Sequence, residues 1–194
     1  RDYCDVREID KMGRKSVDSN EIFIDALPIP ADDLIGEEGM GFRYILQSMN
    51  PERILIGAEA VGIGQEAVRR ASEYANERVV FGRPIGQNQA IQHPLAICWA
   101  ELESAWLMCQ KAATLYDAGE SCGAEANAAK YLGAEAGFKA ATQAVMTHGG
   151  MGFAKEYHVE RLMREVMIPR IAPVSQQLAL CFIAERVLGL PKSY

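Results

Sequence analysis

Hydrophobic and polar positions follow two patterns along the chain, and the change falls near residue 38. Before it, residues 21–25 (EIFID) form the short apolar run of a β-strand, and Pro28 and Pro30 follow in an extended segment. Proline lacks the amide hydrogen that a strand ladder or a helix interior needs. After it, apolar residues recur at helical spacing to the end of the chain. We therefore predict the tail of a β domain over residues 1–37 and a helical bundle domain over residues 38–194.

Glycine, proline and polar breaks divide the second part into six predicted helices. They cover about 41–49, 51–78, 89–118, 124–147, 159–167 and 175–188. Asn50 and Pro51 suit the N-cap and the first position of the second helix. The helix over 124–147 carries small residues that would allow close approach of a neighbour: Ala126, Ala129, Gly133, Ala136, Gly137 and Ala140. Long helices joined by short loops predict an all-α fold, an antiparallel four-helix-type bundle with a short N-terminal β/extended remnant.

Composition narrows the class of protein. A net charge of -6 over 194 residues argues against a nucleic-acid surface, which usually needs a basic face. No apolar stretch reaches the roughly 18 residues of a membrane span. The five cysteines are scattered, without a CxxC pair, so we expect no metal site, reduced thiols and a cytoplasmic location, or the mitochondrial matrix if the source is eukaryotic. Arg1 is not an initiator methionine, so we expect the chain to begin inside a longer one.

Glu52 has two interpretations from its position alone. It lies in the first turn of the predicted long helix, where the helix dipole stabilises a carboxylate, with Arg53 as a surface neighbour. It also begins a series with Glu59, Glu66 and Glu73 at seven-residue spacing, which is typical of a solvated helix face. A carboxylate at a helix start beside a cleft could equally act as a general base. Position does not separate the two interpretations.

Two loops could bind a ligand. Residues 78–85 (RVVFGRPI) combine arginines with Phe81 in a tight turn, and a guanidinium binds phosphate through forked donors. Gly149 and Gly150 would let a ligand approach bare backbone. Both loops also have simple structural interpretations, since basic residues and glycine are common at helix ends. From the residues alone, neither loop establishes a binding site.

Three motifs in order make the chain resemble the acyl-CoA dehydrogenase family over about residues 12–189. They are ERVVFGRPI at 77–85 followed by NQAI at 88–91, GGMGF at 149–153, and VERLMR at 159–164. The family has an N-terminal helical domain, a middle β domain and a C-terminal four-helix bundle. The chain is similar to the last strands of the middle domain plus that bundle. The resemblance implies α,β-dehydrogenation of an acyl-CoA thioester, with FAD between the β domain and the bundle and its adenosine reaching a neighbouring subunit.

The matching motifs imply which residues would contact FAD. Arg78 and Phe81 would contact its pyrophosphate region and Gln89 the nearby cofactor, while Gly149 and Gly150 would line the adenosine side.

The family commonly places its catalytic base in a Tyr-Glu-Gly-Thr motif before the last helix. Here Pro173 stands at the glutamate position, and proline cannot act as a base. Ser175 replaces the threonine and keeps its hydroxyl, and Gln177 is expected to reach the adenine end of the cofactor.

In a second arrangement, seen in isovaleryl-CoA dehydrogenase, the base lies on the first bundle helix as an acidic residue followed by arginine. Glu52 and Arg53 match it, so the resemblance implies Glu52 as catalytic base, with Asn50 and Arg53 as substrate-binding residues. It further implies an electron-transfer flavoprotein as partner and a homodimer or homotetramer. Two alternatives stay open: a same-fold flavoenzyme with different chemistry, and a non-catalytic oligomerisation module.

Overall fold

The computed structural model describes residues 3–193 and divides the chain into two compact units. One unit ends at Gln47 and the other begins at Ser48, so the division falls inside a helix, after the point at which the sequence pattern changes. The two units are described separately.

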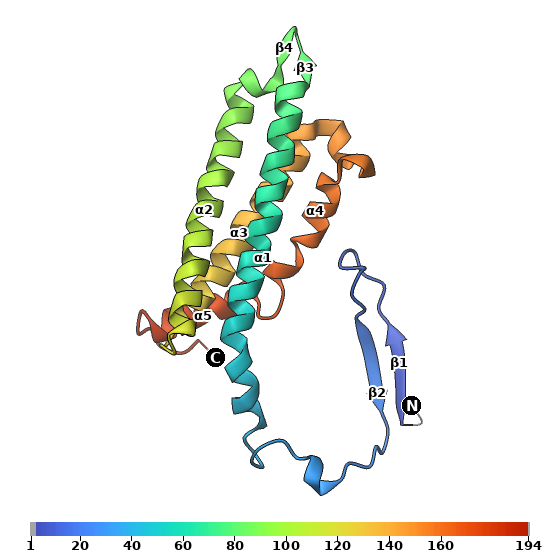
Figure 1. Ribbon diagram of the computed structural model, residues 1–194, viewed down its shortest axis with the longest axis vertical. Helices are drawn as coiled ribbons and strands as arrows, with labels where there is room; N and C mark the ends of the chain where they lie inside the picture. The colour runs from blue at the N-terminus through green and yellow to red at the C-terminus, as the bar shows by residue number, and fades with distance from the viewer. Residues whose placement is uncertain (1–2, 194) are drawn as a thin grey trace. The chain divides into compact units, whose positions relative to one another are not determined.

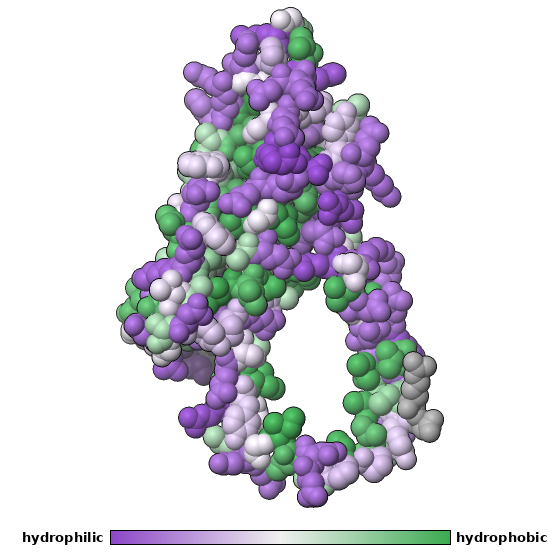
Figure 2. Space-filling view, viewed as in Figure 1, coloured by the Kyte–Doolittle hydropathy of each residue, from purple (hydrophilic) through white to green (hydrophobic). Residues whose placement is uncertain are grey.

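The first unit contains one antiparallel strand pair and a single turn of 3-10 helix. Strand β1 (Cys4–Glu8) pairs with β2 (Asn20–Ile24), with Cys4 opposite Ile24, and η1 covers Ala31–Asp33. Only β2 was predicted, because β1 is mostly polar and carries a single large apolar residue, Val6. Val6, Phe23 and Ile24 are exposed, at 56%, 66% and 56%, and Figure 2 shows green side chains along this unit. A lone two-stranded ribbon is marginal in water, so these side chains lack the cover that a larger sheet would give.

A single long helix, α1 (Gly41–Glu77), replaces the two helices that were predicted at this place. The predicted break at Asn50 and Pro51 is wrong, since Pro51 lies inside α1. Proline fixes φ near the helical value, but inside a helix it removes one hydrogen bond, here the one to the Gln47 carbonyl, and its ring crowds that carbonyl. The helix α1 continues through Pro51 despite this cost. The division between the two units falls at that same carbonyl. Asn50 does not cap a helix; its Oδ1 accepts a hydrogen bond from Arg53 Nη1 at 3.0 Å.

The remaining long helices confirm the prediction to within a few residues. A tight hairpin, β3 (Val79–Val80) and β4 (Arg83–Pro84), and one turn of 3-10 helix, η2 (Ile85–Gln87), follow α1 and lead to α2 (Gln89–Asp117). A short turn reverses the chain into α3 (Gly123–His148). In Figure 1 the three helices run up, down and up. The all-α bundle prediction is confirmed, with the small strand pair at the N-terminal end.

The end of the chain wraps α3 with short elements. They are η3 (Gly149–Phe153), η4 (Lys155–Tyr157), α4 (Val159–Glu165), η5 (Ile168–Arg170) and α5 (Gln176–Arg186). Both α4 and α5 pack against α3. Ser175 caps α5, its hydroxyl accepting from the Leu178 amide at 3.3 Å. Because its neighbours surround it, α3 has no single polar face and buries residues on several sides.

Small residues bring the backbones of α1 and α3 into direct contact. A Cβ atom at Gly133 would lie 2.5 Å from the Gly57 carbonyl oxygen, and one at Gly57 would lie 2.8 Å from the Ala129 carbonyl oxygen. A Cβ at Gly137 would collide with the carbonyl of Ala60 in the same way. The predicted role of the small residues in α3 is therefore confirmed. Around this seam the buried core is made mostly of alanine, with few large side chains.

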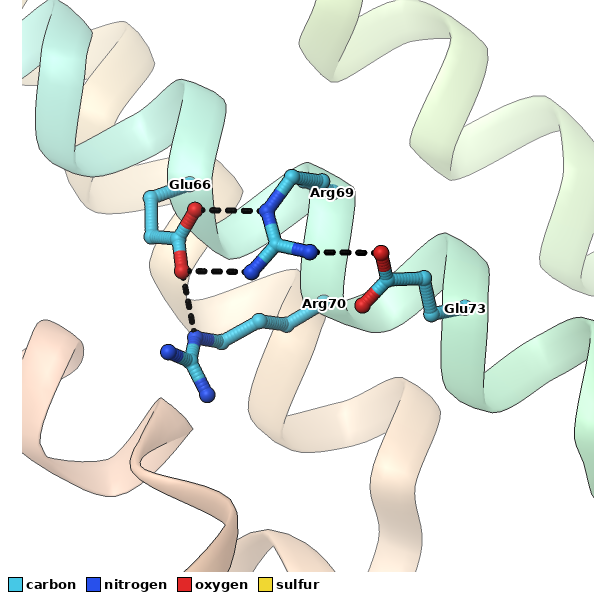
Figure 3. A network of polar contacts seen from close by, with 4 residues as sticks. All are labelled: Glu66, Arg69, Arg70 and Glu73. Carbon is cyan, nitrogen blue, oxygen red and sulfur yellow. Dashed lines mark hydrogen bonds and ion pairs between the residues drawn. The ribbon is translucent and has the colours of Figure 1, made fainter.

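The exposed side of α1 carries a chain of charged residues (Figure 3). Glu66 accepts from Arg69 at 2.7 and 2.8 Å and from Arg70 at 2.6 Å, and Arg69 also donates to Glu73 at 2.5 Å. The hydrogen bond from Arg69 is the main reason that the pKa of Glu66 falls to about 2, with a smaller contribution from Arg70. Exposed pairs of this kind contribute little to stability. The predicted solvated face of the helix is confirmed at Glu66 and Glu73, and both carboxylates accept hydrogen bonds from arginine side chains.

Candidate functional site

Glu52 is partly buried on α1, eleven residues after its first residue, Gly41. It therefore does not lie in the first turn of a helix, and the helix-dipole explanation for its position is wrong because α1 continues through Pro51. Arg53 follows directly and is half-buried, and the Glu52 carboxylate is close enough to stabilise its charge. A carboxylate that is partly shielded from water beside a cation remains available for acid–base chemistry.

Arg53 has spare hydrogen-bonding capacity. Its Nη1 donates to Asn50 Oδ1, but its Nε is buried and has no hydrogen-bond partner in residues 3–193. Burial is the main cause of a lowered pKa for Arg53, and the charge of Glu52 opposes that shift. Leaving a buried guanidinium donor unpaired is unfavourable. A substrate group or another domain could supply the acceptor. The three predicted residues Asn50, Glu52 and Arg53 do lie together, since Arg53 contacts Asn50 and is stabilised by the charge of Glu52.

A polar network that the sequence analysis missed ties α3 to η5 and α5. Lys130 is fully buried on α3, and its Nζ donates to Gln176 Oε1 at 2.9 Å. Gln176 Nε2 donates in turn to Glu135 Oε1 at 2.9 Å and to the Tyr131 carbonyl at 3.3 Å. Arg170 Nε donates to the same Glu135 oxygen at 2.9 Å. The network fixes the first turn of α5, which begins between the predicted ligands Ser175 and Gln177.

A second group of predicted residues lies where α1 ends. In the β3–β4 hairpin Val79 pairs with Pro84, and the two loop residues, Phe81 and Gly82, both have positive φ angles, 53° and 78°. That combination is a type I′ turn, which suits a tight hairpin but is strained for phenylalanine. Phe81 is fully exposed, and Arg78 at the base of the hairpin is exposed too. Both side chains are free to contact a ligand or another chain.

Gly149, Gly150 and Gln89 belong to the same end of the bundle. The ring of Tyr74 in α1 stacks on His148 at a centroid distance of 4.3 Å, and Gly149 follows directly. Gly149 has φ 60°, which favours glycine, and a Cβ at either glycine would meet no atom of the described chain within 4 Å. Bare backbone is thus exposed there. Gln89 begins α2 just after the hairpin and is exposed.

The candidate residues therefore form two separate groups. Besides Ser175 and Gln177, which flank Gln176 of the Lys130 network, one group contains Asn50, Glu52 and Arg53. The other contains Arg78, Phe81, Gln89, Gly149 and Gly150. Glu52 and Arg78 are separated by 26 positions along one helix, which at a rise of about 1.5 Å per residue is roughly 40 Å. A single extended dinucleotide cannot bridge that length.

A groove of about 580 Å³ lies between α2 and α3, away from both motif loops. Its lining includes Ile97, Leu132 and Phe138, and Lys139 Nζ donates to Glu101 Oε1 at 2.6 Å beside them. None of the predicted site residues lines it, so we give the groove no catalytic role. Its mixture of apolar side chains and paired charges is closer to that of a surface that binds another protein.

Lys130, Gln176 and the groove had no clear signal in the sequence. Lysine is rarely buried, so the sequence alone predicts an exposed side chain at Lys130. The one available signal is its surroundings, since Lys130 follows four small or polar residues of the seam at 126–129.

Within residues 3–193, no group of three His, Cys, Asp or Glu side chains is placed to hold a metal ion. In the same part of the chain no helix combines the length and the apolar character needed to cross a bilayer.

Comparison with known proteins identifies the family of the helical part of the chain. The sequence profile described as "Acyl-CoA dehydrogenase, C-terminal domain" matches residues 39–188. The acyl-CoA dehydrogenase FadE12 of Mycobacterium tuberculosis is 47% identical over 176 residues, which is 90% of this chain and 45% of that protein. The chain thus spans less than half the length of this relative.

Solved structures give the same result for the fold. Butyryl-CoA dehydrogenase from Megasphaera elsdenii superposes with a TM-score of 0.91 at 31% identity, over 95% of this chain and 49% of that one. A chain in a structure concerned with the electron transferring flavoprotein of Acidaminococcus fermentans gives 0.92 at 30% identity, with coverage of 95% and 49%. The match over residues 39–188 and these superpositions show that the chain belongs to the acyl-CoA dehydrogenase family, as its C-terminal helical domain.

Proposed function

We propose that this chain is the C-terminal part of an FAD-dependent enzyme that dehydrogenates an acyl-CoA thioester between its α and β carbons. The observation that carries the proposal is a partly buried carboxylate, Glu52, next to Arg53, which is half-buried on α1 and whose Nε has no acceptor in the described residues. The Glu52 carboxylate can act as the base in a chain that has Pro173 where the family commonly has its catalytic glutamate. The similarity to acyl-CoA dehydrogenases, among them FadE12 and butyryl-CoA dehydrogenase, supports the reaction class.

In this proposal Glu52 removes the α proton of the thioester. Arg53 holds its place through Asn50 and keeps positive charge beside the carboxylate, and its free Nε is available to the substrate or to the rest of the enzyme. Bound FAD would accept the β hydrogen as hydride, with both electrons of the C–H bond. Partial burial of Glu52 reduces competition from water for the proton.

The residues at the other end of the bundle fit the phosphate and adenosine part of FAD. Arg78 offers an exposed guanidinium for the pyrophosphate, Phe81 an exposed ring, and Gly149 and Gly150 open backbone. Roughly 40 Å of helix separates Arg78 from Glu52, so one chain would hold the reactive end of one FAD and the adenosine end of another. The proposal therefore includes a second copy of the chain, in a homodimer or homotetramer.

An electron-transfer flavoprotein is the proposed acceptor of the electrons, and the structural neighbour from Acidaminococcus fermentans supports that choice.

A different flavin chemistry on the same fold is the alternative, and the specific observation in its favour is Pro173 in place of the usual glutamate.

The test compares the full-length protein that contains this chain with its Glu52→Gln variant. Each is mixed anaerobically with a panel of acyl-CoA thioesters, and bleaching of the flavin absorbance is followed. We expect bleaching in the unmodified enzyme and a rate about 10²–10⁴-fold lower in E52Q, because a general base typically contributes that much. FAD content and acyl-CoA affinity should stay close to those of the unmodified enzyme.

Glu59→Gln is the matched control, since Glu59 lies seven residues further along the same helix. Equal bleaching in E52Q and the unmodified enzyme would exclude Glu52, and loss of bleaching in E59Q alone would move the role there. If no thioester bleaches the unmodified enzyme, the dehydrogenase proposal fails and the alternative chemistry takes its place.

A further inference from the structure

Three aromatic rings meet where α1 and α3 end. The ring of Tyr74 on α1 lies nearly parallel to that of His148, the last residue of α3, with centroids 4.3 Å apart and planes at 21°. Tyr157 of η4 packs edge-to-face with both, at 5.7 Å from Tyr74 and 5.6 Å from His148. Stacked and edge-to-face pairs at these distances are favourable. The rings therefore fasten α1, α3 and η4 to one another.

His148 has a fixed orientation within this cluster. Its side chain is buried, and its Nδ1 donates to the Ala144 carbonyl at 2.7 Å, since a carbonyl oxygen can only accept. The hydrogen bond orients the imidazole ring, and the Tyr74 ring stacks on it. A ring held from both sides in this way fixes the end of α3 relative to α1.

The loop with the open glycine backbone begins and ends at the same cluster. Gly149 and Gly150 follow His148 directly, and a Cβ at either glycine would meet no atom of the described chain within 4 Å. That side of the loop is open, so its position depends on packing at the two ends. At the far end a Cβ at Gly152 would lie 2.4 Å from a backbone carbonyl oxygen of α3, and Tyr157 returns the chain to the rings.

Tyr74 connects this loop to the guanidinium proposed for the pyrophosphate. Its carbonyl accepts a hydrogen bond from the Arg78 amide at 2.8 Å, and the Arg78 carbonyl accepts from the Ile85 amide at 2.9 Å, where the hairpin closes. Arg78 is thus held relative to Tyr74 through the backbone, and Gly149 through the ring stack. A ligand that contacts both loops finds them already arranged, which lowers the cost of ordering them on binding.

We propose that Tyr74 is a positioning residue for the pyrophosphate and adenosine half of FAD, because its ring holds the backbone of Gly149 and Gly150 in place relative to Arg78. The inference rests on the proposed function, which places this half of FAD on those three residues. Tyr74 acts through the stack and not by contact with the cofactor, so its ring is needed and its hydroxyl is not. Phenylalanine should therefore replace it, and leucine should not.

The test measures how fast FAD leaves the full-length holoenzyme, as the gain in flavin fluorescence after dilution. In Tyr74→Leu the rate of release should rise roughly tenfold, because the stack no longer holds the loop. Tyr74→Phe should release FAD at close to the unmodified rate. His148→Leu removes the other ring of the stack and should act like Y74L, which decides the question if Y74L does not fold.

Val61→Ala is the matched control for lost stability. Val61 is buried on the same helix, but it packs in a different core cluster, with Cys98 and Leu102. V61A should lower the unfolding midpoint of the apoprotein, which is measured for every variant, and leave the rate of FAD release unchanged. If V61A speeds release as much as Y74L does, or if Y74F releases FAD as fast as Y74L, the inference is overturned.

Arg78→Ala separates this inference from the proposed function. Faster release in R78A, together with the unmodified rate in both Y74L and H148L, would overturn the inference alone. The unmodified rate in R78A would remove the proposed place of the pyrophosphate and this inference together. Faster release in R78A, Y74L and H148L, with the unmodified rate in Y74F and V61A, is the result we expect.

Discussion

At the scale of single residues, the structure separates side chains whose charge is satisfied locally from those whose charge is not. Glu66 is held by two arginines on the exposed face of α1, and its ionised form is correspondingly stable. Arg53 and Lys130 are shielded from water, and each donates a hydrogen bond to a neutral amide oxygen, of Asn50 and Gln176 respectively. Such under-paired buried charges tend to occur at functional sites, where a substrate or a neighbouring chain completes them.

Lys130 should make the stability of the chain rise with pH. Its pKa is about 8 when folded and 10.5 in the unfolded chain. Between these values the unfolded state binds more protons than the folded state, so the free energy of unfolding increases as pH rises from about 8 toward 10.5, by at most about 3 kcal/mol. Urea unfolding of the unmodified chain and Lys130→Met at pH 7, 8.5 and 10 measures the effect. The stability advantage of K130M should shrink across this series.

Lys139→Met is the control for that series, since Lys139 lies on the same helix, α3. Its curve should run parallel to that of the unmodified chain between pH 8 and 10, because Lys139 is half exposed and its pKa is raised by Glu101. Parallel curves for K130M and the unmodified chain would show that Lys130 is not buried as a charge.

The sequence allowed Glu52 and Arg53 to be identified as a pair, but it misplaced the reason for their position. Asn50 and Pro51 form a local helix-start signal. It was overridden because the packing and hydrogen bonds of a continuous α1 outweigh the hydrogen bond that Pro51 removes at one carbonyl. Lys130 could not have been selected, since its burial depends on α1, α3 and α5 meeting around it. Local patterns do not contain that information.

At the scale of elements, helix ends were predicted well wherever a capping residue or glycine sets them. Ser175 at the start of α5 and Gly149 after α3 are such cases. Strand β1 was missed because its partner, β2, supplies the pairing and its own residues are mostly polar. The small-residue prediction for α3 held because Gly133 and Gly137 have only one use in a helix interior, which is to remove a side chain from a contact.

Two glycine-to-alanine substitutions test that contact. Gly133→Ala should destabilise the chain by about 1–3 kcal/mol, because its Cβ would meet the Gly57 carbonyl and force α1 and α3 apart. Gly62→Ala is the matched change on α1, where a Cβ would meet nothing in the described chain within 4 Å, and it should stabilise by about 0.5–1 kcal/mol. Denaturant unfolding of both variants measures the pair. Equal effects of the two substitutions would contradict the close seam.

At the scale of the whole molecule, the helical unit carries two groups of candidate residues too far apart to serve one cofactor. Asn50, Glu52 and Arg53 lie on one part of α1, and Arg78 and Phe81 follow its other end. The order of the motifs along the sequence gives no distance in space between the two groups. Only the continuous helix fixes their separation, and that separation requires a second copy of the chain if both groups bind FAD.

The groove between α2 and α3 is the surface on which we expect copies of the chain to meet. Ile97 and Leu132 are 48% and 38% exposed beside it, and its charged residues include both signs, so two copies would not repel each other there despite the net charge of -6. Leu132→Glu would place an unpaired charge in such an interface and should convert the oligomer to monomer at micromolar concentration. Sedimentation velocity measures the assembly state. Leu180→Glu on α5, at a site 43% exposed in the unmodified chain, is the control and should leave the oligomer intact. An unmodified chain that sediments as a monomer, or an L132E variant that stays assembled, would exclude the groove as the contact between copies.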